Sequence, residues 1–249
     1  MDVSVETVTR TFAELMVAVP HANPETTWLT QAPGAFGMVT GVPFPTLNGV
    51  WALGATDPGT VAALLDQLPT DGLPYCLQAS EASRPAMTRV AEGRGMTAGP
   101  DIPVMVLSSQ PEPATIAGLH MREVTGAQRQ LRNEVAAAGF EVPPEAIALA
   151  TDLFGRVPGY RMYVGEVEGR PVTTAVSILA NGGVGIFDVA TPAEHRGHGY
   201  GAAITAYAVA EGFEAGADWA WLQSSTQGYR VYERLGFRTL ATWGLWIGR

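Results

Sequence analysis

The stretch Arg196-Gly197-His198-Gly199-Tyr200-Gly201 joins two segments of different pattern. An apolar run over 184–190 precedes it and is typical of a strand, and an alanine-rich run over 202–215 follows it and is typical of a helix. Three alternate glycines leave the backbone uncovered, so several N–H groups can converge on one anion at the positive end of the helix. Arg196 adds a fixed positive charge. The stretch therefore predicts a loop that holds the diphosphate of a nucleotide-like cofactor.

Two common phosphate-binding motifs do not fit this loop. A nucleoside-triphosphate P-loop ends in a lysine, and the 15 Lys+Arg residues of this chain are all arginines. A dinucleotide fold has the spacing G-x-G-x-x-G and an acid after the next strand, but here the spacing is G-x-G-x-G and the strand expected at 219–222 runs into Gln223-Ser224-Ser225. A dinucleotide-dependent oxidoreductase and a plain glycine-rich turn remain alternatives.

Two motifs resemble a known family. Val189-Ala190-Thr191-Pro192, followed by the glycine-rich stretch, resembles the acyl-CoA signature of the GCN5-related N-acetyltransferases (GNAT), R/Q-x-x-G-x-G/A after a splayed strand. Tyr229-Arg230-Val231-Tyr232-Glu233-Arg234-Leu235-Gly236-Phe237 is similar to the second signature, a short helix ending in Y-x-x-L-G-F. The order and spacing match, and the resemblance covers roughly residues 115–249.

The resemblance implies a mixed α/β (α+β) fold with a central mixed sheet, helices on both faces and acetyl-CoA as co-substrate. It implies that the backbone of Val189, Ala190 and Thr191 pairs with the pantetheine arm. The residues expected around the diphosphate are those of the glycine-rich stretch: Arg196, Gly197, His198, Gly199, Tyr200 and Gly201.

The expected catalytic residues are Tyr232 and Asp188. Tyr232 matches the family tyrosine that donates a hydrogen bond or proton to the departing sulfur; alternatively it is a core residue, with Tyr229 as the fallback donor. Asp188 and Glu166 are the acids on the strands leading to the loop, and alternation places Asp188 on a polar face. Asp188 is the candidate base, although a solvated strand residue, with a water chain acting as base, fits equally well.

Other residues that attract attention have simpler explanations. His195 and His198 are three residues apart, but a metal site needs three or four ligands, so we expect no metal. Tryptophans at alternating positions are expected to pack in the core, or alternatively to line an aromatic acceptor pocket. These are Trp219, Trp221, Trp243 and Trp246.

Composition narrows the class of protein. The 249 residues include 47% hydrophobic and 16% charged residues, which is typical of a globular chain. No apolar stretch reaches the ~20 residues that span a bilayer, and no secretory signal is visible, so we expect a cytoplasmic protein without membrane partners. Its single cysteine, Cys76, fits that expectation. The net charge of −9 argues against nucleic acid and favours a small-molecule amine as partner. The oligomeric state is not predicted.

The chain reads as two tandem copies, with domains expected at 1–112 and 113–249 and the prolines Pro111 and Pro113 at the boundary. Leu77-Gln78-Ala79-Ser80 echoes Leu222-Gln223-Ser224-Ser225, and 89–96 echoes 230–237. The first copy has Gly54-Ala55-Thr56-Asp57-Pro58-Gly59 in place of the glycine-rich stretch, with no arginine and with an anion that repels phosphate. We therefore expect a degenerate first half that serves as scaffold.

Hydrophobic periodicity and turn residues give the expected elements. The expected strands are 27–31, 35–41, 49–53, 73–79, 102–107, 119–124, 161–167, 171–179, 184–190, 219–223 and 239–247. The expected helices are 59–68, 85–92, 125–139, 143–154, 201–215 and 229–235. The resulting hypothesis is an N-acyltransferase, specifically an acetyltransferase, that moves the acetyl group of acetyl-CoA to a primary amine of a small molecule or amino-acid-like acceptor. The alternative is a non-catalytic acyl-CoA-binding or sensor protein.

Overall fold

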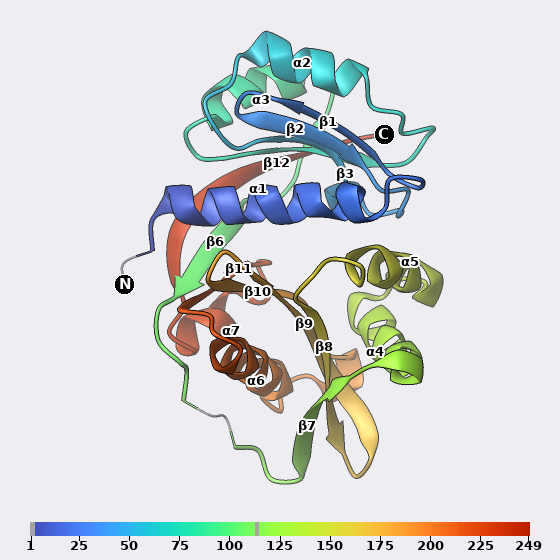
Figure 1. Cartoon of the computed structure of the whole chain (residues 1–249), viewed down its shortest axis with the longest axis vertical. Coiled ribbons are helices and arrows are strands. Elements are labelled where there is room, and N and C mark those ends of the chain that lie inside the picture. Colours follow the sequence, from blue (N-terminus) through green and yellow to red (C-terminus); the bar gives the residue numbers. More distant parts are fainter. Residues whose placement is uncertain (1–2, 113–114) are drawn as a thin grey trace. The chain divides into compact units, whose positions relative to one another are not determined.

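A computed structural model describes residues 3–112 and 115–249 (Figure 1). Within these residues the chain forms two compact units. The C-terminal unit contains residues 105–239, and the N-terminal unit contains 5–104 together with 240–249. The expected division at 112/113 differs from this one, and Pro113 lies outside the described residues. The last strand, which we expected in the second domain, belongs to the N-terminal unit.

The elements have the following bounds. The helices are α1 (Val5–Ala22), α2 (Pro58–Asp66), α3 (Arg84–Gly93), α4 (Arg129–Phe140), α5 (Pro144–Phe154), α6 (Tyr200–Glu214) and α7 (Tyr229–Arg234), with 3-10 turns η1 (Pro45–Leu47), η2 (Gly126–Gln128) and η3 (Ala193–His195). The strands are β1 (Trp28–Ala32), β2 (Ala35–Val39), β3 (Asn48–Ala52), β4 (Tyr75–Ala79), β5 (Thr97–Ala98), β6 (Ile102–Leu107), β7 (Leu119–Val124), β8 (Tyr160–Val167), β9 (Arg170–Ala180), β10 (Gly183–Ala190), β11 (Trp219–Gln223) and β12 (Arg238–Gly248).

In the N-terminal unit the strand order is β1-β2-β3-β4-β12. The pairing is antiparallel except between β3 and β4, which run parallel, and β5 pairs with β12. Helices α2 and α3 lie on one face of this sheet and α1 on the other (Figure 1). The core under α2 and α3 is made of aliphatic residues such as Val61, Leu77 and Met87, each without exposed surface.

In the C-terminal unit the strand order is β7-β8-β9-β10-β11. Strands β7 to β10 are antiparallel neighbours, and β10 and β11 run parallel. Helix α6 covers one face and α4 covers the other (Figure 1). Both units are therefore mixed sheets with helices on both faces, which confirms the expected fold class.

All of the expected elements are present, with ends shifted by a few residues. Three differences stand out. Helix α1 was not expected, although Val8, Phe12 and Leu15 recur on one face and are buried. The expected helix at 125–139 begins with the 3-10 turn η2 and becomes α-helical only at Arg129. The short strand β5 was missed because two residues carry no periodicity.

The last strand joins the first half of the chain through backbone pairing. Residues Gly244–Gly248 of β12 pair antiparallel with Tyr75–Ala79 of β4. An exposed edge of β4 would carry unpaired N–H and C=O groups, and β12 satisfies them.

None of the helices in the described parts of the chain has the length and apolar character that crossing a bilayer requires.

Candidate functional site

Strand β10 bends and separates from its parallel neighbour before the glycine-rich loop. The recorded pairing of β10 with β11 covers Gly183–Gly185 against Trp219–Trp221. On the other side the register of β10 with β9 shifts between Phe187 and Ala190, and Asp188 within this bulge has φ 48°. A β-bulge redirects the strand and its peptide groups. The carboxyl end of β10 is thus turned away from β11, as expected for a splayed strand.

The loop after β10 leads into a helix start that no side chain caps. Gly197 has φ 82° and Gly199, the N-cap residue of α6, has φ 81°. This left-handed conformation is readily adopted by glycine. The first-turn amides of a helix have no intrahelical acceptor, and no acidic residue lies in the first turn of α6. The amides of Tyr200, Gly201 and Ala202 are therefore directed at a position where an anion is favoured.

The protein leaves space at this helix start. A Cβ placed on Gly197 would meet no atom within 4 Å. One placed on Gly201 would meet only Thr191 Oγ1, at the ordinary contact distance of 3.5 Å. Packing within the protein therefore does not require glycine at 201. Close approach of a phosphate to the backbone would require glycine, because a side chain would occupy the same space. These residues fit a diphosphate.

The Arg196 side chain joins two backbone segments next to the loop. Its Nε donates to Thr191 O (3.1 Å) and its Nη2 donates to Gly139 O (3.0 Å). A Cβ on Gly139 would lie 2.8 Å from Ala190 Cβ, so α4 approaches the end of β10 closely at this point. Arg196 therefore ties the end of α4 to the residue that follows β10.

The bulge is also held from β9. The Thr173 hydroxyl donates to Ala190 O (3.1 Å) and lies 2.9 Å from Thr191 Oγ1. Thr173 is fully buried and Ala190 is buried, whereas Val189 and Thr191 are half-buried. The backbone expected to meet a pantetheine arm is thus fixed on one side by side-chain hydrogen bonds.

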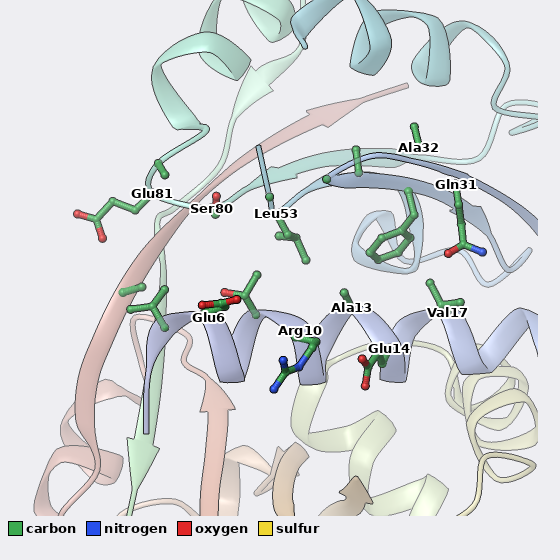
Figure 2. A pocket seen from close by; sticks show the side chains of 18 residues that line it. Glu6, Arg10, Ala13, Glu14, Val17, Gln31, Ala32, Leu53, Ser80 and Glu81 are labelled. Carbon is green, nitrogen blue, oxygen red and sulfur yellow. The ribbon is translucent and has the colours of Figure 1, made fainter. Parts of the chain in front are cut away.

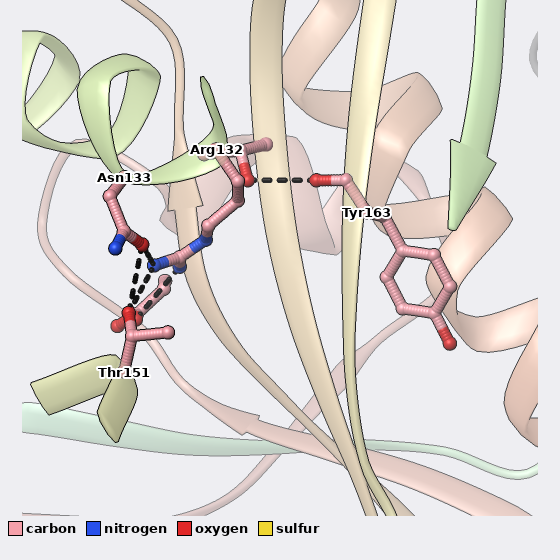
Figure 3. A network of polar contacts seen from close by, with 6 residues as sticks. Arg132, Asn133, Thr151 and Tyr163 are labelled. Atoms are coloured by element: carbon pink, nitrogen blue, oxygen red, sulfur yellow. Dashed lines mark hydrogen bonds and ion pairs between the residues drawn. The ribbon is translucent and has the colours of Figure 1, made fainter. Parts of the chain in front are cut away.

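Asp188 forms an ion pair with Arg132 that the sequence did not predict. Figure 3 shows Arg132 together with Asn133 and Thr151. Asp188 Oδ2 accepts from Nη2 of Arg132 in α4 at 2.9 Å. The Arg132 side chain is 0% exposed and the Asp188 side chain 42%. Nη1 of Arg132 donates to Thr151 Oγ1 (3.3 Å) and Asn133 Oδ1 (3.4 Å). A buried guanidinium needs an anionic partner, so Asp188 has a structural task that competes with the proposed role as base.

Tyr232 is half-buried and packs against the core of the C-terminal unit next to Phe237, with ring centroids 6.1 Å apart. Burial raises the pKa of Tyr232 to about 12, so its phenol keeps its proton at neutral and mildly alkaline pH. A Cβ on Gly228 would lie 2.8 Å from the Tyr232 ring, so glycine makes room for it. The fallback donor Tyr229 instead shares a hydrogen bond of 3.1 Å with Thr239.

The remaining candidates have other partners, and of these only His198 lies in the glycine-rich loop. Glu166 pairs with Arg122 at 2.7 Å. The four tryptophans are buried in the core, as expected (Trp219, Trp221, Trp243 and Trp246). In the described part of the chain no group of three His, Cys, Asp or Glu residues could hold a metal. His198 stacks on Tyr200, with centroids 5.3 Å apart, and its Nδ1 lies 3.0 Å from Arg196 O.

A family model and several solved structures are similar to this chain. Residues 158–239 match the family model "Acetyltransferase (GNAT) domain". No curated protein matches the chain. A GCN5-related N-acetyltransferase from Kribbella flavida has 22% identity and a TM-score of 0.74, over 99% of this chain and 95% of that one.

Two further solved structures share the fold over nearly the whole length. One is a GCN5-related N-acetyltransferase from Sphaerobacter thermophilus, with 19% identity, a TM-score of 0.64 and coverage of 95% and 91%. The other is a tandem GNAT protein from the clavulanic acid biosynthesis pathway, with 15% identity, a TM-score of 0.60 and coverage of 94% and 86%. The family model and these likenesses agree with the resemblance found in the two sequence motifs.

Proposed function

We propose that this chain, which carries a GNAT domain in a tandem arrangement, is an N-acyltransferase that moves the acetyl group of acetyl-CoA to a primary amine of a small molecule. The observation that carries the proposal is the start of α6. It lacks a side-chain cap, follows two glycines in the left-handed conformation, and directs its free amides at a space that the protein leaves open. Directly upstream, the bulged end of β10 diverges from β11.

Acetyl-CoA, when bound, supplies a thioester whose acetyl group can pass to an amine. In the proposal, the amides of Gly199–Ala202 hold the diphosphate, because they combine unsatisfied donors with the positive end of the helix. The backbone of Val189–Thr191 aligns the pantetheine arm, held in place by Thr173 and Arg196. Fixing both reactants in one geometry is a major source of rate enhancement in such a transfer.

Tyr232 is the proposed proton donor to the departing sulfur. A phenol whose pKa is about 12 is protonated at neutral pH and can donate a hydrogen bond. An unperturbed thiol has a pKa of about 8.5, so the thiolate leaves with modest help. The acceptor must arrive as the free amine, and water is the proposed route for its proton, since Asp188 is engaged by Arg132.

A second candidate function is a non-catalytic acyl-CoA sensor. The ion pair of Asp188 favours the sensor, because the acid that was the candidate base is held by a structural partner, Arg132. Pure protein incubated with acetyl-CoA and a panel of small amines distinguishes the two candidates through release of free thiol. Release that depends on the amine supports the enzyme, and binding of acetyl-CoA without release with any amine supports the sensor.

The substitution Gly201→Ala tests the proposed diphosphate site. The added methyl group contacts only Thr191 Oγ1, at 3.5 Å, so the fold should tolerate it. Alanine favours helix over glycine by up to about 1 kcal/mol, so the thermal midpoint should stay the same or rise. The same methyl group occupies the space next to the amides, and we expect the affinity for CoA in calorimetry to fall at least roughly tenfold.

Gly212→Ala in the same helix is the matched control. Its Cβ would lie 2.7 Å from three Val184 atoms, so this variant should lose stability. Where it is folded, it should retain CoA binding, since Gly212 faces the sheet and not the loop. Unchanged CoA affinity in Gly201→Ala would contradict the proposed position of the diphosphate.

A further inference from the structure

The N-terminal unit repeats the βαβα order of the C-terminal unit. There, β3-α2-β4-α3 corresponds to β10-α6-β11-α7, and each segment contains one parallel strand pair. Gly49–Ala52 of β3 pair with Cys76–Ala79 of β4. In open α/β sheets, ligands bind outside the carboxyl ends of parallel strands. The corresponding place in this unit is the region after Ala52 and Ala79.

The helix start in this region is closed to phosphate. Asp57 is the N-cap of α2, and its Oδ2 accepts a hydrogen bond of 3.0 Å from Thr60 N. Pro58 at the first helical position has no N–H to offer. The carboxylate therefore occupies the position, and carries the charge, that a bound phosphate has at α6. A diphosphate would be repelled here.

A cavity of about 880 Å³ nevertheless lies at the carboxyl ends of these strands, between α1 and the sheet (Figure 2). This volume is within the range of small-molecule sites. Every residue that lines it belongs to the N-terminal unit. Its wall is mainly apolar, and the apolar lining includes Ala13, Val17, Ala35, Phe36, Leu53 and Ala241.

The lining includes three carboxylates, Glu6, Glu14 and Glu81, and one arginine, Arg10. Glu6 and Glu81 lie at the end of the cavity next to Ser80, whereas Val17 and Gln31 lie at the other end (Figure 2). Glu81 also accepts a hydrogen bond from Thr242 N at 3.4 Å. Arg10 is the one cationic side chain among the lining residues, and Figure 2 shows it directed away from the sheet. On the side toward the sheet the lining is thus mainly apolar, with Glu6 and Glu81 at one end, while Glu14, like Arg10, is directed away from the sheet (Figure 2).

We infer that the N-terminal unit holds a second small-molecule site, which takes a primary amine with an apolar body and does not take coenzyme A. The ammonium group lies near Glu6 and Glu81, where it finds opposite charge, and the apolar body lies along Leu53 and Val17. The wall removes apolar surface from water, which supplies most of the affinity. This inference does not depend on the proposed function, because it rests on residues of the other unit.

Calorimetric titration of the full chain with hexylamine tests the inference, with hexan-1-ol and hexanoate as the neutral and anionic probes. We expect hexylamine to bind more tightly than hexan-1-ol, and hexanoate to bind most weakly. Shortening the amine to butylamine should weaken binding by roughly three- to fourfold for each methylene removed. Equal affinity for the amine and the carboxylate would overturn the inference.

Variants locate the binding. Ala13→Phe fills the cavity from α1 and should abolish binding of hexylamine. Glu6 is exposed in the first turn of α1, so Glu6→Gln should lower the free energy of unfolding by at most about 1 kcal/mol. This variant should weaken binding of hexylamine roughly two- to fivefold and leave binding of hexan-1-ol unchanged. The matched control Glu92→Gln removes an exposed carboxylate of the same unit outside the cavity and should change neither. Hexylamine affinity that is unchanged in both Ala13→Phe and Glu6→Gln would place the binding elsewhere and overturn the inference.

Titration with CoA separates this inference from the proposed function. We expect one CoA per chain, with the affinity for CoA lowered in Gly201→Ala and unchanged in Ala13→Phe. Two CoA molecules per chain would contradict the conclusion that the start of α2 excludes a diphosphate. Absence of CoA binding would defeat the proposed function alone, while a hexylamine response sensitive to Glu6→Gln would still support the second site.

Discussion

Substitution of Asp188 distinguishes a structural role of this residue, in the ion pair with Arg132, from a catalytic role as the base. Asp188→Asn removes the anionic partner of a guanidinium whose side chain is 0% exposed. The hydrogen bonds that remain go to neutral oxygens of Thr151 and Asn133, at 3.3 and 3.4 Å. The Nε of Arg132 has no partner among the described residues, so it cannot compensate. We expect the variant to fold with a lower free energy of unfolding.

The magnitude follows from the exposure of the two partners. Removing one member of a fully buried pair costs about 3–5 kcal/mol. Because the Asp188 side chain is 42% exposed, water can approach the guanidinium, and the asparagine oxygen can still accept a hydrogen bond. We therefore expect a loss of about 1–3 kcal/mol. In a domain of this size, that loss lowers the thermal midpoint by roughly 2–10 °C.

Chemical denaturation of a double-mutant cycle measures this effect. Arg132→Met combined with Asp188→Asn should recover much of the loss, since the buried charge is then gone. The control is Glu166→Gln at the more exposed pair with Arg122, where we expect a loss below about 1 kcal/mol. Wild-type stability of Asp188→Asn, combined with loss of turnover and of the pH dependence of kcat/KM, would refute this reasoning and identify Asp188 as the base.

Three further predictions concern single residues. Tyr232→Phe should lower kcat roughly 10- to 100-fold with unchanged CoA affinity, and wild-type kcat should show no loss at mildly alkaline pH from this phenol, whose pKa is about 12; a pH–rate profile of both proteins checks this. Arg196→Lys cannot bridge Thr191 O and Gly139 O together, so calorimetry should show CoA affinity lowered about three- to tenfold at nearly unchanged stability. Gly49→Ala would place Cβ 1.9 Å from Cys76 O, and we expect urea unfolding to show a loss of about 1–3 kcal/mol or more.

Most of the fold was predictable because its elements have strong periodic patterns. The apolar runs of β8 to β11 and the alanine-rich α6 are long, and glycine or proline ends them. Helix α1 was predictable from the same periodicity but was not recognised. The position of β12 was not predictable. Its sequence predicts an apolar strand but does not indicate which strand it pairs with, and the pairing with β4 assigns it to the N-terminal unit.

The site was predictable where backbone chemistry defines it. The alternating glycines predicted an uncovered backbone, and Gly197 and Gly199 both adopt the left-handed conformation, with φ above 80°. The partners of Asp188 and Arg196 depend on the packing of α4 against β10, which local sequence does not encode. The burial of Arg132 could have been predicted from the helical period. It precedes the buried residues Val135 and Ala136 by one helical turn and therefore lies on the same, buried face.

The starts of α2 and α6 occupy corresponding positions in the two units but differ in how their first amides are satisfied. Asp57 satisfies an amide of α2 with its own carboxylate, an arrangement that stabilises a helix by about 1 kcal/mol. Gly199 gives α6 no such cap, and its left-handed backbone is accessible to few other residues. The C-terminal unit therefore forgoes this stabilisation at the point where we propose that an external anion supplies the missing acceptors. The N-terminal unit supplies its own anion at the corresponding helix start. The cap residues, Gly199 in one unit and Asp57 in the other, are thus one difference between the proposed cofactor site and the helix start that repels phosphate.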